Sequence, residues 1–255
     1  MVRIFIVLFG IYIFLSSNAM AAFGPDIDTT PVFEEDFDKP LDPSVWEVGF
    51  WKEHHGQLKP ENCFVKDGML YMILRYDGKT KTIFSSAIQT KKTFLYGRWE
   101  YRAKISPIKK MLCSFYTIDW GGGAGTKQEI DIEFLTFTFG EGRGKVHFAI
   151  HAAGKTSAGT DIELGFNPSD DFHIYGFEIT PEKVEWFVDK KVLYTYKYSD
   201  KGNDIVINSP YILKLNTRGD SGWVQGPPKK DTDCIYLIDW IRFYPYKGTT
   251  PEPKK

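Results

Sequence analysis

The segment 128–135 reads Gln-Glu-Ile-Asp-Ile-Glu-Phe-Leu, with acidic and apolar residues alternating along its length. In a β-strand successive side chains point to opposite faces, so this alternation predicts a strand with one apolar face and one acidic face. The apolar face, which suits a protein core, would hold Ile130, Ile132 and Phe134. The acidic face would hold Glu129, Asp131 and Glu133, with no Lys or Arg between them.

Three carboxylates on one face interact strongly, because each ionised carboxylate raises the pKa of its neighbours. Cleavage of a glycosidic bond requires a pair of carboxyl groups with separated pKa values, one ionised and one protonated. The solvated face of any half-buried strand shows the same alternation, so the segment alone leaves both interpretations open.

Short alternating runs predict β-structure along nearly the whole chain. Turn residues such as Asp67-Gly68 and Asn167-Pro168 separate these runs. Since no amphipathic helices intervene, the spacing predicts an all-β fold in which two antiparallel sheets pack face to face. The predicted strands are 69–76, 97–105, 112–118, 129–135, 145–151, 173–179, 184–188, 211–215 and 235–244.

The first 22 residues differ in character from the rest of the chain. Arg3 is followed by an apolar run over 4–15 and then by small residues, which is typical of a secretory signal peptide cleaved after Ala19 or Ala21. The apolar run is shorter than the ~20 residues that span a bilayer as a helix, and an uncleaved anchor is the alternative. We therefore expect a secreted or periplasmic protein with no membrane contact after cleavage.

The remainder is expected to form one domain over 23–247, followed by a flexible tail over 248–255. The 255 residues include 32 basic and 33 acidic side chains, and this balance offers no basic surface for nucleic acid.

The chain has three cysteines, and this odd count permits one disulfide and leaves one thiol. Cys113 lies in an apolar run, so it is predicted to be a buried thiol. Pairing of Cys63 with Cys234 stays open.

Aromatic residues make up 16% of the chain, and most of them must pack in the core. Trp99, Trp186 and Trp240 lie inside predicted strands and are predicted to be core residues. Three other tryptophans stand beside Gly-, Pro- or charge-rich segments, where a ring either stacks on a sugar or packs internally. They are Trp51, Trp120 and Trp223.

Several motifs in a fixed order resemble glycoside hydrolase family 16, in particular its bacterial lichenase-like members, over roughly residues 32–246. The acidic strand Glu129-Ile130-Asp131-Ile132-Glu133 is similar to the signature of that family. Motifs in the expected order across most of a chain are a stronger sign than one short segment. The others lie at 35–37, 43–46, 85–91, 96–104, 172–175, 186–189 and 239–244.

The resemblance implies a concanavalin A-like jelly roll of two curved antiparallel sheets, with the signature strand crossing a concave cleft. It implies that Glu129 is the nucleophile, that Asp131 assists it and that Glu133 is the acid/base. His151, which matches a cleft-lining position, is a candidate substrate-binding residue together with Trp120 and Trp223. A structural role for His151 is the alternative.

The resemblance also implies a retaining endo-β-glucanase that hydrolyses a polysaccharide. We expect the protein to be a monomer. The signature lacks the extra residue found before the last Glu in many β-1,3-glucanases, which favours mixed β-1,3/β-1,4-linked glucan as the substrate. Several positions depart from the lichenase pattern and weaken that assignment, namely Phe84, Ser86, Lys127, Gln128 and Ala149. Two alternatives are a transglycosylase that acts on cell-wall glucan and a non-catalytic carbohydrate-binding sandwich.

Retention needs two carboxyl groups ~5–5.5 Å apart. Four residues along a straight strand separate Cα atoms by ~13 Å, so retention requires a strand that curves toward the substrate.

The resemblance implies no cofactor for catalysis. It does imply a structural Ca²⁺ at positions that match Asp36, Gly68 and Asp239, and oxygen ligands suit this ion.

Overall fold

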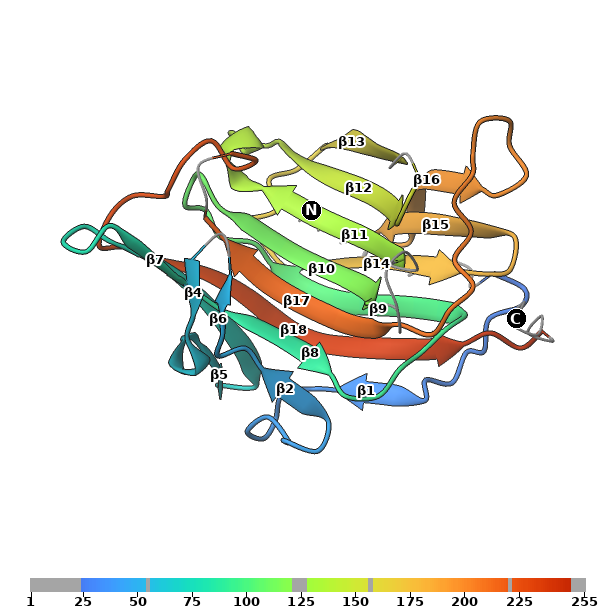
Figure 1. Ribbon diagram of the computed structural model, residues 1–255, viewed down its shortest axis with the longest axis horizontal. Coiled ribbons are helices and arrows are strands. Elements are labelled where there is room, and N and C mark those ends of the chain that lie inside the picture. The colour runs from blue at the N-terminus through green and yellow to red at the C-terminus, as the bar shows by residue number, and fades with distance from the viewer. Residues whose placement is uncertain (1–23, 54–55, 121–127, 156–157, 220–221, 249–255) are drawn as a thin grey trace, which may run out of the picture.

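The computed structural model describes residues 24–53, 56–120, 128–155, 158–219 and 222–248, and in this part of the chain the strands form two sheets that lie face to face (Figure 1). The predicted signal peptide and nearly all of the predicted tail lie outside the described residues. No helix among the described residues is long and apolar enough to cross a membrane.

The first sheet, with eleven strands among the described residues, lies behind the other in Figure 1. Its main path is β16-β15-β14-β9-β18-β6-β7-β4-β3, with β1 beside β18 and β5 beside β6. The strands are β1 (Phe33–Glu35), β3 (Lys52–Glu53), β4 (Gly56–Leu58), β5 (Cys63–Lys66), β6 (Met69–Asp77), β7 (Thr82–Ser85), β9 (Gly97–Lys104), β14 (His173–Ile179), β15 (Lys183–Val188), β16 (Lys191–Lys197) and β18 (Asp233–Pro245).

The second sheet faces the viewer in Figure 1 and has seven described strands in the order β13-β12-β11-β10-β17-β8-β2. They are β2 (Trp46–Val48), β8 (Ala87–Thr90), β10 (Leu112–Asp119), β11 (Gln128–Leu135), β12 (Gly144–Ala152), β13 (Ala158–Leu164) and β17 (Ile212–Arg218). Two short 3₁₀ turns, η1 (Pro60–Asn62) and η2 (Thr136–Thr138), complete the described elements.

All nine predicted strands are present as β6, β9, β10, β11, β12, β14, β15, β17 and β18. Strands that periodicity did not predict are mostly short, and the two longer ones, β13 and β16, lie at the edges of their sheets. One pairing departs from the antiparallel prediction, because β4 runs parallel to β7.

The core lies between the sheets and is built largely from aromatic rings. Tyr101 of β9 stacks on Phe115 of β10 at 4.0 Å between ring centroids, which joins one sheet to the other. Trp99 and Trp186 are fully buried, which confirms the prediction that they belong to the core. Such large buried rings contribute most of the area removed from water.

The core prediction for Trp240 is wrong. Buried side chains of β18 follow even positions up to Ile238 and odd positions from Ile241, because the register slips between Ile238 and Trp240. A bulge inserts one residue and reverses which side chains point inward, so Trp240 is left half-buried on the outer face. There the guanidinium of Arg242 lies 5.0 Å from its ring centroid.

The three cysteines are all buried free thiols, as predicted for Cys113, and no disulfide joins Cys63 to Cys234. Both residues flank β6, Cys63 opposite Met72 and Cys234 opposite Leu74, so a strand separates them.

Candidate active site

β11 occupies the third position of the seven-stranded sheet and divides its side chains between the core and the opposite face. Ile130, Ile132 and Phe134 are completely buried in the core. Glu129, Asp131 and Glu133 therefore share the other face, as the alternation predicted. β11 pairs with both neighbours without a register shift across this segment, so the three acids form an unbroken row.

The pairing register aligns specific side chains with each acid across the sheet. Residues directly opposite one another on neighbouring strands have Cβ atoms about 4.5–5.5 Å apart, so each acid has fixed neighbours. In the row of Asp131, the partners on the same face are Gln89, Lys214, Tyr116, Ala149 and Gly159. In the row of Glu133 they are Ala87, Asn216, Ser114, His147 and Asp161.

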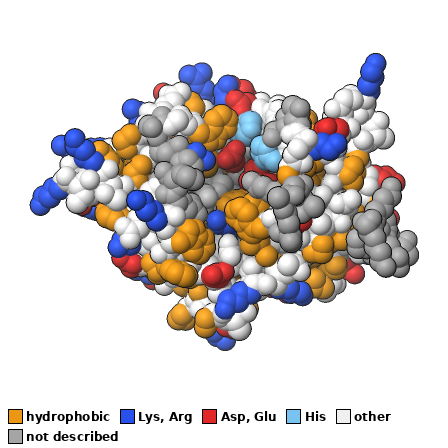
Figure 2. Space-filling model, in the orientation of Figure 1, with side chains coloured by type: hydrophobic (Ala, Val, Ile, Leu, Met, Phe, Trp, Pro, Cys, Tyr) orange, Lys and Arg blue, Asp and Glu red, His pale blue; other side chains and the backbone are white. Residues whose placement is uncertain are grey.

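Figure 2 shows acidic and histidine side chains gathered near the middle of this face, over β11 and β12, with hydrophobic side chains around them. This charged centre among apolar and aromatic groups is typical of a ligand site, where a few polar groups fix the orientation of what binds.

Asp131 is the most deeply buried acid of the row, at 4% exposed. Its Oδ2 lies 3.2 Å from Nε2 of His151, which stands opposite Glu129 on β12. Its backbone carbonyl accepts a hydrogen bond of 3.0 Å from Nε1 of the buried Trp186. Asp131 is thus held from both sides, and the candidate His151 lies beside the acids.

The pKa of Glu133 is raised from 4.5 to about 7, first because the side chain is removed from water and next because Asp131 is close by. Glu129 adds a smaller rise, while the nearby His147 and His151 lower the pKa. A buried carboxyl group beside another acid disfavours its charged form. Near neutral pH Glu133 can therefore carry a proton while a neighbouring acid is ionised, as acid/base chemistry requires.

His147 is a site residue that the sequence analysis missed. It stands opposite Glu133 on β12, and its Nδ1 lies 2.7 Å from Oδ1 of Asp161 on β13. Its ring meets the edge of Trp223 at 5.3 Å, which brings the predicted Trp223 to the same end of the acid row. The signal was available, because His147 and His151 alternate with apolar residues along one predicted strand.

Lys214 is a second residue that the sequence analysis missed. It alternates with the core residues Leu213 and Leu215 on β17, so it belongs to the acidic face, yet it is only 4% exposed. Its Nζ lies 5.4 Å from the ring of Trp51, 5.9 Å from that of Tyr116 and 5.7 Å from that of Trp120. Cations within about 6 Å of aromatic faces are attracted to them, so Lys214 holds these rings together.

The two predicted tryptophans at the face remain accessible. Trp120 is 59% exposed and Trp223 is 42% exposed. Trp120 lies beside Lys214 and Trp223 beside His147, so the two rings flank the acid row on opposite sides. Exposed rings in such places offer flat apolar faces to a ligand.

The predicted calcium ligands do not fit a cation site. The carboxylate of Asp36 lies 2.5 Å from the guanidinium of Arg242, and that of Asp239 is paired with Arg102. An arginine at each carboxylate repels a divalent cation. Gly68, the third predicted ligand, lies in a turn with φ of 70° and has no side chain to offer a cation. The described residues contain no group of three His, Cys, Asp or Glu side chains that could hold a metal.

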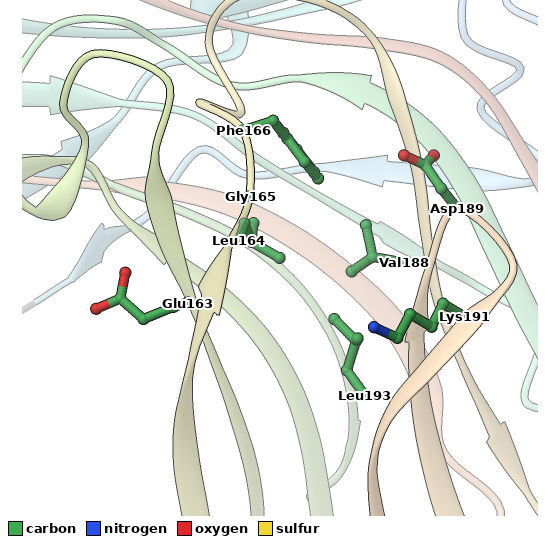
Figure 3. Close-up of a pocket in the computed structure, with 8 residues that line it drawn as sticks. All are labelled: Glu163, Leu164, Gly165, Phe166, Val188, Asp189, Lys191 and Leu193. Carbon is green, nitrogen blue, oxygen red and sulfur yellow. The ribbon is translucent and has the colours of Figure 1, made fainter.

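A cavity of about 300 Å³ opens elsewhere, at the edge of the sandwich between β13 and the β15–β16 hairpin (Figure 3). The Lys191 side chain points into it, whereas the Glu163 carboxylate points away and pairs with Lys145 at 3.0 Å. None of the three acids lines this cavity. We therefore place the chemistry on the face of the seven-stranded sheet and not in this cavity.

Known proteins resemble this chain along most of its length. The family model described as "Glycosyl hydrolases family 16" matches residues 44–242. A β-glucanase of Acetivibrio thermocellus is 33% identical over 160 residues, which are 60% of this chain and 46% of that protein. A β-glucanase of Brevibacillus brevis is 23% identical over 258 aligned positions, 97% of this chain and 95% of that protein. The chain thus spans about half of the first relative and nearly all of the second.

Solved structures with the same fold include two glucanases. The catalytic domain of an endo-1,3-β-glucanase (laminarinase) from Thermotoga petrophila has a TM-score of 0.74 and 26% identity, covering 86% of this chain and 98% of that one. A β-1,3-1,4-glucanase (lichenase) from a mouse hindgut metagenome has a TM-score of 0.68 and 27% identity, covering 83% and 97%. The two sheets and these neighbours confirm the predicted jelly roll.

The raised pKa of Glu133 predicts that Glu133→Gln stabilises the protein at high pH. In the unfolded chain this carboxyl ionises near its ordinary value, but in the fold it keeps its proton until about pH 7, so unfolding becomes easier as the pH rises between the two values. Gln resembles the protonated acid and avoids this cost. We expect equal stability near pH 4 and a gain of about 1–3 kcal/mol at pH 8, measured by urea unfolding.

The exposed Glu163, which pairs with Lys145, supplies the matched control. Glu163→Gln should show no gain that grows with pH. A Glu133→Gln gain that is the same at pH 4 and pH 8 would contradict the raised pKa.

Proposed function

This chain belongs to glycosyl hydrolase family 16 and is a glycoside hydrolase, and we propose that it is an endo-β-glucanase that cleaves mixed β-1,3/β-1,4-linked glucan with retention. The observation that carries the proposal is the row of Glu129, Asp131 and Glu133 on one face of β11. Burial and the neighbouring Asp131 raise the pKa of Glu133 to about 7. The family match spans the acid row, and we propose 23–247 as the catalytic domain. Catalysis in this family needs no cofactor.

In the first step, Glu133 donates its proton to the glycosidic oxygen while the carboxylate of Glu129 attacks the anomeric carbon. The carbon–oxygen bond to the leaving chain breaks, and a glycosyl ester forms on Glu129. In the second step, Glu133 removes a proton from water, the water oxygen attacks the anomeric carbon, and the ester bond breaks. The balance is one water consumed for one glycosidic bond cleaved, with both acids restored.

Asp131 lies between these two acids in the row and is held by His151. We propose that it keeps the nucleophile oriented and, through its charge, keeps Glu133 protonated before the first step. Retention also needs the carboxyl tips of Glu129 and Glu133 to converge to ~5–5.5 Å. Because four residues of a straight strand separate Cα atoms by ~13 Å, the proposal requires β11 to curve toward the substrate.

The choice of glucan rests on the strand itself. β11 runs without a bulge through the acids, as the lichenase-like signature implies, and one structural neighbour is a lichenase. Another neighbour is a laminarinase, so fold alone does not select the linkage. Trp120, His151 and Trp223 flank the acids and are our proposed substrate-binding residues.

At two of the positions that depart from the lichenase pattern, the side chains serve the structure. Ser86 is fully buried and bonded to Thr217, and Gln128 binds the backbone of Val206 and Asn208. Sugar contacts must therefore come from other residues of the face, and Lys214 with its three rings is the best-placed group. We propose this cluster as a sugar-stacking subsite. We also propose that the protein acts as a monomer.

Export of the protein is a further part of the proposal, supported by the pattern of residues 1–22. We expect the protein recovered outside the cytoplasm to begin after Ala19 or Ala21. Mass spectrometry of its N-terminus would measure this. Recovery of an intact chain that still begins at Met1 would contradict cleavage.

Loss of either catalytic acid should slow hydrolysis severely. We expect Glu129→Ala to lower kcat on lichenan at least a thousandfold or so, since no ester can form, and Glu133→Gln to lower it by about 10²–10⁴. In the wild type, kcat/KM should fall above about pH 7, because Glu133 then loses its proton. Release of reducing ends from lichenan, laminarin, xyloglucan, agarose and carrageenan measures these rates.

Glu163→Gln, at the edge of the sheet, is the control and should keep wild-type rates. If the wild type binds lichenan but releases no reducing ends from any polysaccharide of the panel, the chain is a binding sandwich and the proposal is wrong. The same panel tests the linkage, because preference for laminarin would replace the mixed-linkage assignment.

Retention predicts that the first product carries the β configuration at its new reducing end. Proton NMR of early time points distinguishes this β-anomer from the α-anomer that inversion would release. Sizing of the same products separates hydrolysis, which only shortens chains, from transglycosylation, which lengthens some of them. An α-anomer formed first would contradict the role of Glu129 as nucleophile.

A further inference from the structure

The start of β11, where Glu129 lies, is attached to the segment that leads into β17. β11 begins at Gln128, so Glu129 is the second residue of the strand, and the ends of elements open more readily than their middles. Gln128 stands opposite Asp119 at the end of β10 and lies on the core-facing side of its strand. There its side chain meets the segment 205–209, which precedes β17.

The amide of Gln128 forms hydrogen bonds to this segment with both its nitrogen and its oxygen. Its Nε2 donates to the backbone carbonyl of Val206 at 3.0 Å and to Oδ1 of Asn208 at 2.9 Å. Its Oε1 accepts from the backbone N–H groups of Asn208 at 2.9 Å and of Ser209 at 3.3 Å. The reversed amide would place its NH₂ group against two N–H donors, so these partners fix its orientation.

Ser209 extends the attachment to the neighbouring strand β10. Its hydroxyl donates to Oδ2 of Asp119 at 2.6 Å and lies 3.0 Å from Oε1 of Gln128. Since Asp119 and Gln128 are register partners, one serine joins the ends of two paired strands. Asp119 precedes Trp120 in the chain, and Gln128 precedes Glu129. The same contacts therefore hold the backbone beside a proposed substrate-binding ring and beside the proposed nucleophile.

The segment 205–209 is itself anchored, which makes it a firm support. Ile205 and Ile207 are completely buried, and the backbone N–H of Ile205 donates to the hydroxyl of Tyr196 on β16 at 3.3 Å. Groups packed in a dense core move little. Bonds to this segment therefore restrict the start of β11 to one position.

We propose that Gln128 is a positioning residue for Glu129, because its bonds to the segment 205–209 hold the start of β11 where the Glu129 carboxylate can reach the anomeric carbon. The inference rests on the proposed function of Glu129 as nucleophile. Reacting atoms must approach to about 3–3.5 Å, and a displacement of about 1 Å can slow a reaction roughly a hundredfold. A loosened strand end should therefore slow ester formation more than it weakens substrate binding.

The test is Gln128→Met, which keeps the length of the side chain and removes the hydrogen bonds of its amide. We expect kcat/KM on lichenan, which reports the steps up to ester formation, to fall by about tenfold to a hundredfold. The Kd of a lichenan tetrasaccharide, measured in the Glu133→Gln background, should change by less than about twofold. The control is Asn203→Ala in the same connection, where the amide bonds to Lys197 of β16, and it should keep wild-type rates.

Azide separates a positioning role from a general weakening of the fold. In Glu129→Ala no nucleophile remains to be positioned. Azide can then attack the anomeric carbon of a dinitrophenyl β-glycoside, and a carbon–nitrogen bond forms as dinitrophenolate leaves with the electrons of the carbon–oxygen bond. Adding Gln128→Met to Glu129→Ala should leave this azide-dependent rate unchanged. If Gln128→Met lowers the azide-dependent rate as much as the wild-type rate, or lowers neither, the inference is overturned.

Hydrogen exchange separates this inference from the proposed function, because it needs no substrate. Faster exchange of the backbone amides of residues 128–130 in Gln128→Met, but not in Asn203→Ala, supports the attachment of the strand end. Unchanged exchange in Gln128→Met would overturn it. If exchange rises but Glu129→Ala keeps the wild-type rate without azide, the attachment stands and the assignment of Glu129 as nucleophile fails instead.

Discussion

The registered pairing of β11 between β10 and β12 is the constraint on which the site depends. Ile130, Ile132 and Phe134 are fully buried, so the hydrophobic effect fixes which side of the strand points inward. A slip of one residue would bury the acids and expose the apolar residues, at a cost that no local contact could offset. The core therefore determines the position of the chemistry, although no core residue takes part in it.

The same arrangement gathers like charges in a place partly shielded from water. Asp131 is nearly buried, and its charge lies beside two other carboxyl groups of the row. Two imidazoles on β12 and a buried lysine on β17 lie beside the row, and the raised pKa of Glu133 limits the negative charge that the row carries. Burying neighbouring carboxyl groups lowers the stability of the fold, but it also keeps one acid protonated next to an ionised one. Such a compromise between stability and function is common in active sites.

Much of the fold and of the site could be predicted, because both depend on local alternation of apolar and polar residues. The nine long strands, the acidic face of β11 and the buried Trp99 and Trp186 all follow from which residues alternate along the chain. Features set by distant pairing escaped prediction. The bulge that turns Trp240 outward and the parallel pairing of β4 with β7 leave no mark in the local pattern.

The site residues also divide into those that a local pattern predicts and those that only distant pairing brings together. Glu129, Asp131 and Glu133 stand out within one segment. In contrast, His147 contacts Asp161 on another strand, and Lys214 lies beside rings from two separate segments. Their partners become visible only once the sheet register is known. A single sequence records the residues of such a cluster but not their proximity.

The buried thiols have a practical consequence for how this protein can be produced. With no covalent crosslink among the described residues, the sandwich is held together by noncovalent contacts alone. Burial raises the pKa of the Cys63, Cys113 and Cys234 thiols, which keeps the reactive thiolate scarce. Folding of the domain therefore needs no oxidant, and bacterial expression would need neither a foldase for disulfides nor passage through the periplasm.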